Sequence, residues 1–278
     1  MRQALLLLSV TLLASALLAG CALPTHPGER LQQAEAAGFR RQLIEARGFT
    51  LVAMLRVRDP HAPLRVYIEG DGRAWLDRYT VSDDPTPHRP LALQLAMADR
   101  APNVAWLARP CQFSLAQSPA CEPAHWTDRR FAPEMVEAMG VALDHVTQTA
   151  GGSLELVGYS GGAALAVALA ARRSDVTLLV TVAGNLDTDA VNRFHRVALM
   201  PASLNPVTLA PQLAALPQRH LVGAADAVIP TGVATAFVAA GAMRCAEVII
   251  TAGVGHDAGW LDYWRAQKDP VARPGCGK

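Results

Sequence analysis

Lysine is nearly missing from this sequence. The 278-residue chain carries 25 basic side chains, but only Lys268 and Lys278 are lysines, and neither is followed by Ser or Thr. The phosphate-binding loop of nucleotide-hydrolysing enzymes needs Lys before Ser or Thr, so phosphoryl transfer by that route is excluded. The 24 acidic side chains leave a net charge of +1, which gives no basic field or polybasic cluster for nucleic acid. We therefore expect no nucleic-acid partner and no nucleotide.

Metal-binding motifs are missing as well. The sequence contains no Cys-x-x-Cys, no His-x-x-x-His and no His-Glu pair in a helical pattern, so we expect no metal and no cofactor. The composition, 51% hydrophobic and 18% charged, is that of a folded chain with a substantial core. The length is enough for one large domain.

The first twenty residues have the pattern of an export signal. Arg2 gives a positive start, and residues 4–19 form an uncharged run rich in Leu and Ala. A membrane-spanning helix needs roughly 20 apolar residues, and this run stops at Gly20-Cys21, so a spanning helix is the weaker interpretation. The segment Leu18-Ala19-Gly20-Cys21 resembles the lipobox of bacterial lipoproteins, which implies cleavage before Cys21 and acylation of Cys21. An ordinary secretory signal with a chance cysteine is the alternative.

Residues 21–48 are predicted to form the lipidated N-terminus and a tether that runs into a short helix. Pro24, Pro27 and Gly28 precede a polar stretch at 29–35. By resemblance to enterobacterial lipoproteins, Asp after the cysteine would mean retention at the inner membrane, and this chain has Ala22. We therefore predict a lipid-anchored protein of the cell envelope, held in the outer membrane and facing the periplasm.

The other cysteines agree with that location. If Cys21 carries lipid, four remain, an even set for an oxidising compartment. Four cysteines allow three pairings. A short Pro-rich loop separates Cys111 from Cys121 and favours that pair, which leaves Cys245 with Cys276 to fix the C-terminal tail.

Apolar runs and helical stretches alternate along residues 49–278. The expected strands are 50–57, 64–68, 104–108, 154–157, 177–182, 220–222 and 247–251, and the expected helices are 91–100, 133–149, 161–173 and 233–241. This alternation predicts an α/β fold, with a mostly parallel sheet covered by helices on both faces. No repeat or low-complexity linker divides the region, so we expect a single domain.

The motif Gly158-Tyr159-Ser160-Gly161-Gly162 lies where an apolar strand meets an Ala-rich helix. This strand-turn-helix arrangement holds a serine strained and exposed, and glycines two positions before and after avoid clashes with neighbouring backbone. The N–H of Gly161, at the positive end of a helix, would face a developing oxyanion. A glycine-rich turn with an idle serine is the alternative.

With this motif the chain resembles the α/β-hydrolase family, and the resemblance spans roughly residues 50–264. It implies that an acid follows a late strand and that a histidine follows the next one. Asp226 and His256 occupy those places, with Asp187 and His195 as rivals for the two roles. Asp257 is expected to be a surface group or to act on the site only through another residue. The implied mechanism is acyl transfer: Ser160 attacks a carbonyl, His256 moves the proton and Asp226 orients His256.

The second oxyanion donor is expected in the loop after strand 64–68. The resemblance implies a His-Gly pair there, but this sequence has Glu69-Gly70-Asp71-Gly72. The backbone N–H of Asp71 is our first choice and that of Gly72 the second. The carboxylates would disfavour an oxyanion unless they point away or are neutralised by Arg73, Arg129 or Arg130. Glu69 or Asp71 could also bind a cationic substrate group, although a structural ion pair is the simpler interpretation.

Residues 185–216 are rich in small and apolar side chains and lie where this fold usually carries a cap. We predict a small cap that shapes the pocket. Trp75, Trp106, Trp126 and Trp260 suggest an apolar acyl or aromatic group on the substrate, or simple core packing.

The predicted function is that of a serine hydrolase acting on a carboxylic ester. A peptidase or amidase, and a hydrolase-fold lipoprotein that binds or assembles without turnover, are the alternatives. The run Gly253-Val-Gly255-His-Asp-Ala258 formally matches a dinucleotide fingerprint, but only 20 residues follow it, too few for the rest of such a unit.

Overall fold

The computed structural model describes residues 27–150 and 152–276, and the sequence-based predictions for the leader and for Cys21 lie outside this range. Its centre is an eight-stranded sheet in the order β1-β2-β4-β3-β5-β6-β7-β8. β2 runs antiparallel to both neighbours, and all other pairings are parallel. The strands are β1 (Arg40–Ala46), β2 (Phe49–Val57), β3 (Leu64–Ile68), β4 (Asn103–Leu107), β5 (Leu154–Tyr159), β6 (Val176–Val182), β7 (Gln218–Gly223) and β8 (Ala246–Thr251). The predicted mostly parallel sheet is confirmed.

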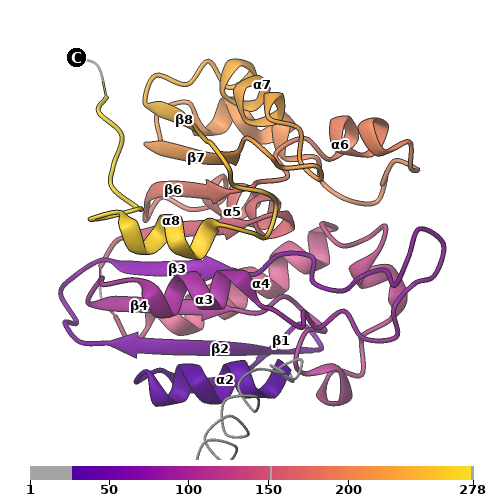
Figure 1. Ribbon diagram of the computed structural model, residues 1–278. Helices are drawn as coiled ribbons and strands as arrows, with labels where there is room; N and C mark the ends of the chain where they lie inside the picture. The colour runs from indigo at the N-terminus through magenta and orange to yellow at the C-terminus, as the bar shows by residue number, and fades with distance from the viewer. Residues whose placement is uncertain (1–26, 151, 277–278) are drawn as a thin grey trace, which may run out of the picture.

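Helices cover both faces of the sheet (Figure 1). One face packs against α4 (Pro133–Thr147), α5 (Gly161–Ala170) and α7 (Gly232–Ala240), and the other against α2 (Pro27–Ala36), α3 (Leu91–Ala98) and α8 (Trp260–Ala266). The remaining elements are α6 (Thr188–His195) and the short 3-10 helices η1 (Leu115–Gln117), η2 (Pro123–Trp126) and η3 (Pro206–Leu213). Within the described residues no helix is long and apolar enough to cross a membrane.

Successive side chains of β2 point alternately into the hydrophobic cores on the two faces of the sheet. Leu51, Ala53 and Leu55 pack with α4 and α5, whereas Val52 and Met54 pack with α2 and α3. This alternation follows from the pleat, which points successive side chains to opposite faces. Because both faces are covered, the central strands are continuous apolar runs, as the sequence indicated.

The N-terminal boundary of the domain differs from the predicted one. α2 and β1 belong to the folded unit, because β1 pairs with β2 along its whole length and Leu31, Phe39 and Ile44 are buried in the cores. Residues 27–48 are therefore an edge of the domain and not a tether, although the predicted short helix is present. The charged pattern of β1, Arg-Arg-Gln-Leu-Ile-Glu-Ala, is that of an edge strand with one solvated face.

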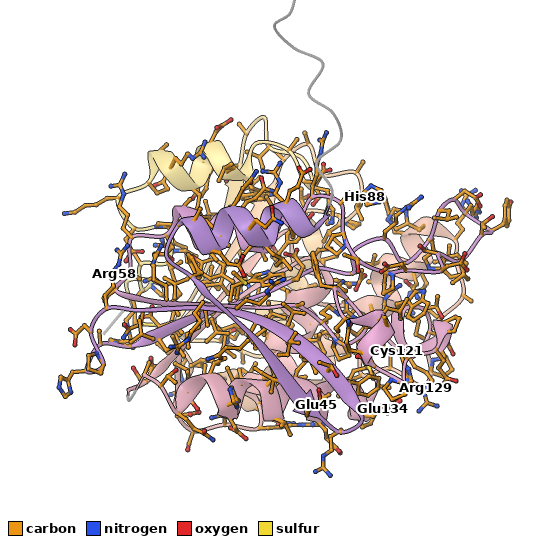
Figure 2. The ribbon with its side chains drawn as sticks, turned by 90° about the horizontal axis from the view of Figure 1, so that it is seen from below. Glu45, Arg58, His88, Cys121, Arg129 and Glu134 are labelled. Atoms are coloured by element: carbon orange, nitrogen blue, oxygen red, sulfur yellow. A yellow bond between two sulfur atoms is a disulfide. The ribbon has the colours of Figure 1, made fainter. Side chains whose placement is uncertain are left out.

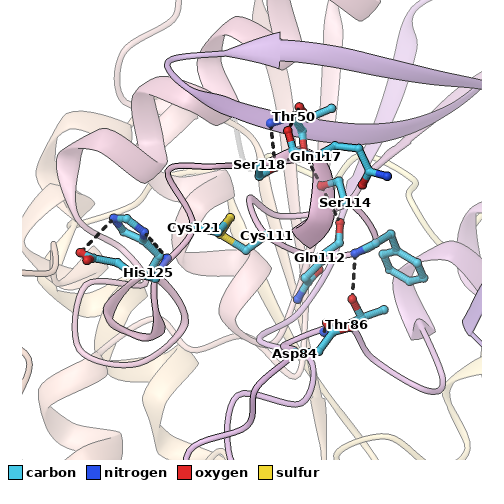
Figure 3. Close-up of a disulfide and its surroundings, with 12 residues drawn as sticks. Thr50, Asp84, Thr86, Cys111, Gln112, Ser114, Gln117, Ser118, Cys121 and His125 are labelled. Carbon is cyan, nitrogen blue, oxygen red and sulfur yellow. Dashed lines mark hydrogen bonds and ion pairs between the residues drawn. A yellow bond between two sulfur atoms is a disulfide. The ribbon is translucent and has the colours of Figure 1, made fainter.

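Both expected disulfides are present. Cys111 and Cys121 have Cα atoms 5.7 Å apart, and those of Cys245 and Cys276 are 4.7 Å apart. The first closes the loop after β4 (Figure 3). The second joins the residue before β8 to the C-terminal tail.

Candidate active site

Ser160 lies on a sharp turn between β5 and α5. Its backbone has φ 52° and ψ −121°, a region that costs a non-glycine residue energy. The turn needs glycine on both sides: a Cβ at Gly158 would lie 2.5 Å from the Cα of Ala163, and one at Gly162 would overlap the carbonyl oxygen of Ile68. The turn raises the serine at the carboxyl edge of the sheet, where its side chain lines a pocket.

Ser160, His256 and Asp226 form one chain of hydrogen bonds. The Oγ of Ser160 is 3.0 Å from the Nε2 of His256, and the Nδ1 of His256 is 2.9 Å from the Oδ2 of Asp226. Three loops supply these residues, after β5, β7 and β8. The side chain of Asp226 is 1% exposed and that of His256 17%, so the carboxylate is sequestered while the imidazole reaches the pocket.

Hydrogen bonds keep Asp226 ionised despite its burial. Its Oδ1 accepts the N–H groups of Val228 at 2.7 Å and Ile229 at 2.9 Å, and its Oδ2 faces His256. Burial acts to raise the pKa of Asp226, but the bonds from His256, Ile229 and Val228 outweigh it and hold the pKa below its ordinary value. A carboxylate in this position can orient His256 and stabilise its protonated form.

The loop that carries His256 is fixed by aromatic neighbours. The indole Nε1 of Trp260 donates to the carbonyl oxygen of His256 at 3.0 Å. The ring of Tyr159, next to the serine, lies 5.5 Å from the imidazole ring between centroids. These contacts limit the positions that the imidazole can take.

The rival residues have other roles. Asp187 caps α6 by accepting from the N–H of Ala190 at 3.0 Å, and it also accepts from the side chain of Asn205. His195 ends α6, and its Nε2 lies 2.7 Å from the carbonyl oxygen of Val228. Asp257 is exposed and lines the pocket, as a surface group would. The structure thus brings Asp226 and His256 to Ser160, and not Asp187 or His195.

Two backbone N–H groups beside Ser160 have no acceptor. Within the described part of the chain, neither the N–H of Gly161 nor that of Asp71 donates a hydrogen bond to the protein. Gly161 begins α5, where the first N–H groups of a helix lack intrahelical partners. Asp71 follows β3, the strand next to β5, and its carboxylate lies so close to Gly161 that a Cβ there would overlap it. Gly161 and the side chain of Asp71 are therefore neighbours, in the loops that follow two adjacent strands.

The Asp71 carboxylate is neutralised by two arginines. Arg109 donates to its Oδ1, and the Nε of Arg130 lies 3.5 Å from its Oδ2. Burial acts to raise the pKa of Asp71, but Arg130 and Arg109 outweigh it and hold the pKa below its ordinary value. Of the arginines proposed from sequence for this role, only Arg130 serves it, because Arg129 pairs with Glu134 and Arg73 approaches His88.

Glu69 points into the protein. Its two oxygens accept from the N–H groups of Gly70, Ala92 and Leu93 and from the indole of Trp106, so it caps the start of α3. Burial raises the pKa of Glu69 despite these four bonds. With Glu69 bound to α3 and Asp71 bound to two arginines, their contacts do not support binding of a cationic substrate group.

Arg109 and Gln112 hold the Glu69–Gly72 segment, and sequence reasoning missed both. The Nε2 of Gln112 donates to the carbonyl oxygen of Gly70 at 2.9 Å, and the N–H of Arg109 donates to the Oε1 of Gln112 at 3.2 Å. Figure 3 shows Gln112 next to Cys111, in the loop that the first disulfide closes. The only available signal was position: Arg109 follows β4, which neighbours β3, so both loops meet at the same edge.

A pocket of about 590 Å³ opens in front of Ser160. Besides the site residues, its wall consists of Gly72, Arg73, Trp75, Pro87, His88 and Arg89 from the loop between β3 and α3. None of residues 185–216 lines it, so the predicted cap does not shape the pocket; η3 instead packs against α5 and α7. Trp75 is the one predicted tryptophan in the wall, since Trp106, Trp126 and Trp260 are buried in the core.

Within the described residues, no group of three or more His, Cys, Asp or Glu side chains is placed so that it could hold a metal ion.

Comparison of the sequence with models of protein families gives no match, and neither does comparison with curated proteins. Solved structures do match. The esterase Est1E from Butyrivibrio proteoclasticus is 13% identical, with a TM-score of 0.56 over 80% of this chain and 93% of its own. An alpha-beta serine hydrolase homologue from Coxiella burnetii is 17% identical, with a TM-score of 0.58 over 81% of this chain and 93% of its own. An esterase from Pyrococcus furiosus is 12% identical, with a TM-score of 0.57 over 82% of this chain and 87% of its own.

At such low sequence identity, these structural matches show the fold alone. The strand order, the helices on both faces and the extent of the matches agree with one another. The chain has the α/β-hydrolase fold.

Proposed function

We propose that this protein is a serine hydrolase that cleaves a carboxylic ester by acyl transfer through Ser160, His256 and Asp226. The observation that carries the proposal is the continuous hydrogen-bond chain from Ser160 through His256 to Asp226, with the serine on a strained turn in the wall of a pocket. The esterases and serine hydrolase of the same fold support it.

In the first half-reaction the Oγ of Ser160 attacks the ester carbonyl while the Nε2 of His256 takes its proton. The new C–O bond gives a tetrahedral oxyanion, which collapses as the ester C–O bond breaks and His256 returns the proton to the leaving alcohol. In the second half-reaction water attacks the acyl-serine by the same route and releases the acid. Asp226 keeps the proton of His256 on Nδ1 throughout, so that Nε2 faces the serine as an acceptor.

The N–H groups of Gly161 and Asp71 would bind the oxyanion. Neither N–H group has another acceptor in the described part of the chain, and each donor of this kind contributes about 10²–10³-fold in rate where it has been removed from other enzymes. A carboxylate beside the oxyanion would oppose this effect. Arg109 and Arg130 pair with Asp71 and so remove much of that repulsion.

Lipid anchoring at Cys21 and a periplasmic location at the outer membrane form part of the proposal. They are supported by the leader pattern and by two disulfides, which persist in oxidising compartments. Mass spectrometry of the protein from a bacterial envelope should find an acylated Cys21 at the N-terminus. A mature chain that begins elsewhere would contradict the anchor.

Turnover tests the hydrolase proposal. Residues 22–278 keep every described element, because the first of these elements begins at Pro27. We expect this protein to hydrolyse nitrophenyl esters faster than the matching anilides, and Ser160→Ala and His256→Ala to abolish the activity. Faster cleavage of the anilides would favour an amidase. A folded protein without activity on either series would favour a scaffold role.

A further inference from the structure

Most of the large apolar side chains that the structure leaves exposed lie on segments that follow the strands at the carboxyl edge of the sheet, the edge at which the active-site pocket opens. Of nine such side chains in the described residues, six lie on two neighbouring segments: Trp75, Leu76, Tyr79, Phe194, Val197 and Leu199. A seventh, Val228, lines the pocket together with Trp75. We call these seven residues the apolar collar.

Two contacts join the segments of the collar. The guanidinium of Arg78 donates to the carbonyl oxygen of Arg196 at 3.2 Å, which ties the loop after β3 to the end of α6. The Nε2 of His195 lies 2.7 Å from the carbonyl oxygen of Val228, which ties the end of α6 to the loop after β7. The segments that carry the collar are therefore held together beside the pocket.

The exposure of the collar is high for such side chains. Tyr79 is 85% exposed, Phe194 58% and Trp75 44%. Soluble proteins seldom leave large apolar patches in water unless something binds them, and aromatic side chains with a polar tip suit the boundary between lipid and water.

The charges around the collar nearly balance. Arg73, Arg78, Arg89, Arg193 and Arg196 stand on its two segments and at the pocket rim, and Asp77, Asp83, Asp84, Asp189 and Asp257 stand among them. A surface of this kind offers no net field to a strongly charged partner. It fits an apolar one.

The direction of the chain at α2 and β1 indicates what the collar contacts. β1 runs antiparallel to β2, which is antiparallel to β4, so β1 has the direction of β3. α2 leads into β1 through a tight turn, and it therefore begins at the carboxyl edge of the sheet, where the pocket opens (Figure 1). Figure 2 agrees, because α2 begins on the side of the pocket residue His88, opposite Arg58 at the far edge.

Cys21 precedes Pro27 by six residues, which span about 20 Å at most. A lipid on Cys21 would thus hold this edge of the protein close to a membrane.

We propose that the apolar collar docks on the surface of a lipid bilayer, so that the pocket opens toward the membrane and takes up an ester carried by a lipid. The choice of substrate rests on the proposed hydrolase function. The closeness of the pocket to the bilayer rests on the proposed lipid anchor. Docking rests on the exposure of the collar, and the choice of a bilayer as the partner also rests on the course of the chain between Cys21 and α2.

Trp75 is a built-in probe of docking. Of the five tryptophans it alone is exposed, since Trp106, Trp126, Trp260 and Trp264 are at most 5% exposed. We therefore expect phosphatidylcholine vesicles to shift the emission of residues 22–278 to the blue and lipids with brominated acyl chains to quench it. Trp75→Phe should remove both signals. The measurement uses Ser160→Ala protein, so the result does not depend on turnover.

Substitutions with matched controls test the surface. We expect the double variant Tyr79→Ser/Phe194→Ser to lower vesicle binding, measured by sedimentation, about tenfold or more, because both rings lose their place in the bilayer. Leu43→Ser and Ile250→Ser are the controls: these side chains are 59% and 58% exposed but lie on β1 and β8, outside the collar. Thermal unfolding checks that all variants fold.

Binding that is the same on phosphatidylcholine and phosphatidylglycerol, and little changed by 0.5 M salt, would agree with apolar docking. Three results would overturn the proposal: binding that needs anionic lipid and disappears in salt, equal losses in the control variants, or no vesicle binding. If vesicle binding is missing and the protein forms a dimer in solution that the double variant dissociates, the collar is the contact surface of a second copy of the chain.

Discussion

Replacing Asp226 by Asn exchanges one carboxylate oxygen for an NH₂ group, and it tests whether Asp226, rather than its rival Asp187, is the acid of the proposed triad. In the native site the Oδ1 of Asp226 accepts two backbone N–H groups, and the Oδ2 faces the Nδ1 of His256. The amide oxygen of Asn can keep the two backbone bonds, which leaves the NH₂ group facing Nδ1. His256 must then accept there and carry its proton on Nε2, so it can no longer take the proton of Ser160.

We expect Asp226→Asn to lower kcat by about 10³–10⁴-fold, because the imidazole is held in the wrong tautomer and loses its stabilising charge. The unfolding free energy should change by about 1 kcal/mol or less, since the two backbone hydrogen bonds of Oδ1 remain. The assay is nitrophenyl ester turnover beside urea unfolding of the same preparation.

Asp187→Asn is the matched control. Asn is also a good helix cap, so this variant should keep both kcat and the cap of α6 within about 1 kcal/mol. Our reasoning is refuted if Asp226→Asn retains a tenth or more of the activity, or if Asp187→Asn loses as much as Asp226→Asn does.

Further predictions concern the surroundings of the site. Arg109→Met should cost about 3–5 kcal/mol of stability in urea unfolding, because it leaves Asp71 beside Gly161 with one weaker partner, and kcat should fall with it; an unchanged kcat would show that the pair is only structural. Because the pKa of Asp71 is lowered in the folded state, the stability that Asp71 contributes is present at neutral pH and is lost as acid takes the pH below about 4, and Asp71→Asn should flatten that acid limb. Glu69→Gln should lower the free energy of unfolding by about 1–3 kcal/mol, since its amide NH₂ would face two N–H donors. An unchanged melting temperature would contradict the four hydrogen bonds described for Glu69. Reducing the disulfide of Cys111 and Cys121 should cost about 3 kcal/mol by the loop-entropy argument and lower kcat, whereas equal activity of the reduced protein would show that Arg109 keeps its position without it.

Local patterns in the sequence predicted the sheet and the serine turn. The central strands are continuous apolar runs because helices cover both faces of the sheet. The pattern Gly158-x-Ser160-x-Gly162 predicts a sharp turn in which a Cβ at either glycine would overlap neighbouring backbone atoms. Asp226 and His256 were predicted from the resemblance to the α/β-hydrolase family, since each follows a late strand, and Asp187 and His195 were left as rivals. β1 was missed because its charged, half-exposed residues look like a tether when its partner strand is unknown.

The residues that sequence reasoning missed act over long separations. Arg109 is 38 positions from Asp71, and nothing near either residue signals that they meet. The same is true of the pocket wall: residues 185–216 have the composition of a cap, but the loop between β3 and α3 lines the pocket instead. Such facts follow from how the loops at one edge of the sheet pack, which no local pattern records.

Covalent labelling by a fluorophosphonate tests the central claim most directly. Residues 22–278 would be treated with the probe, and the modified peptide identified by mass spectrometry, with Ser160→Ala and His256→Ala as controls. We predict one adduct per chain on Ser160, formed rapidly in the native protein, lost in Ser160→Ala and slowed at least a hundredfold in His256→Ala. A folded protein that takes up no probe, or labelling that does not depend on His256, would contradict the claim that these residues form an activated serine.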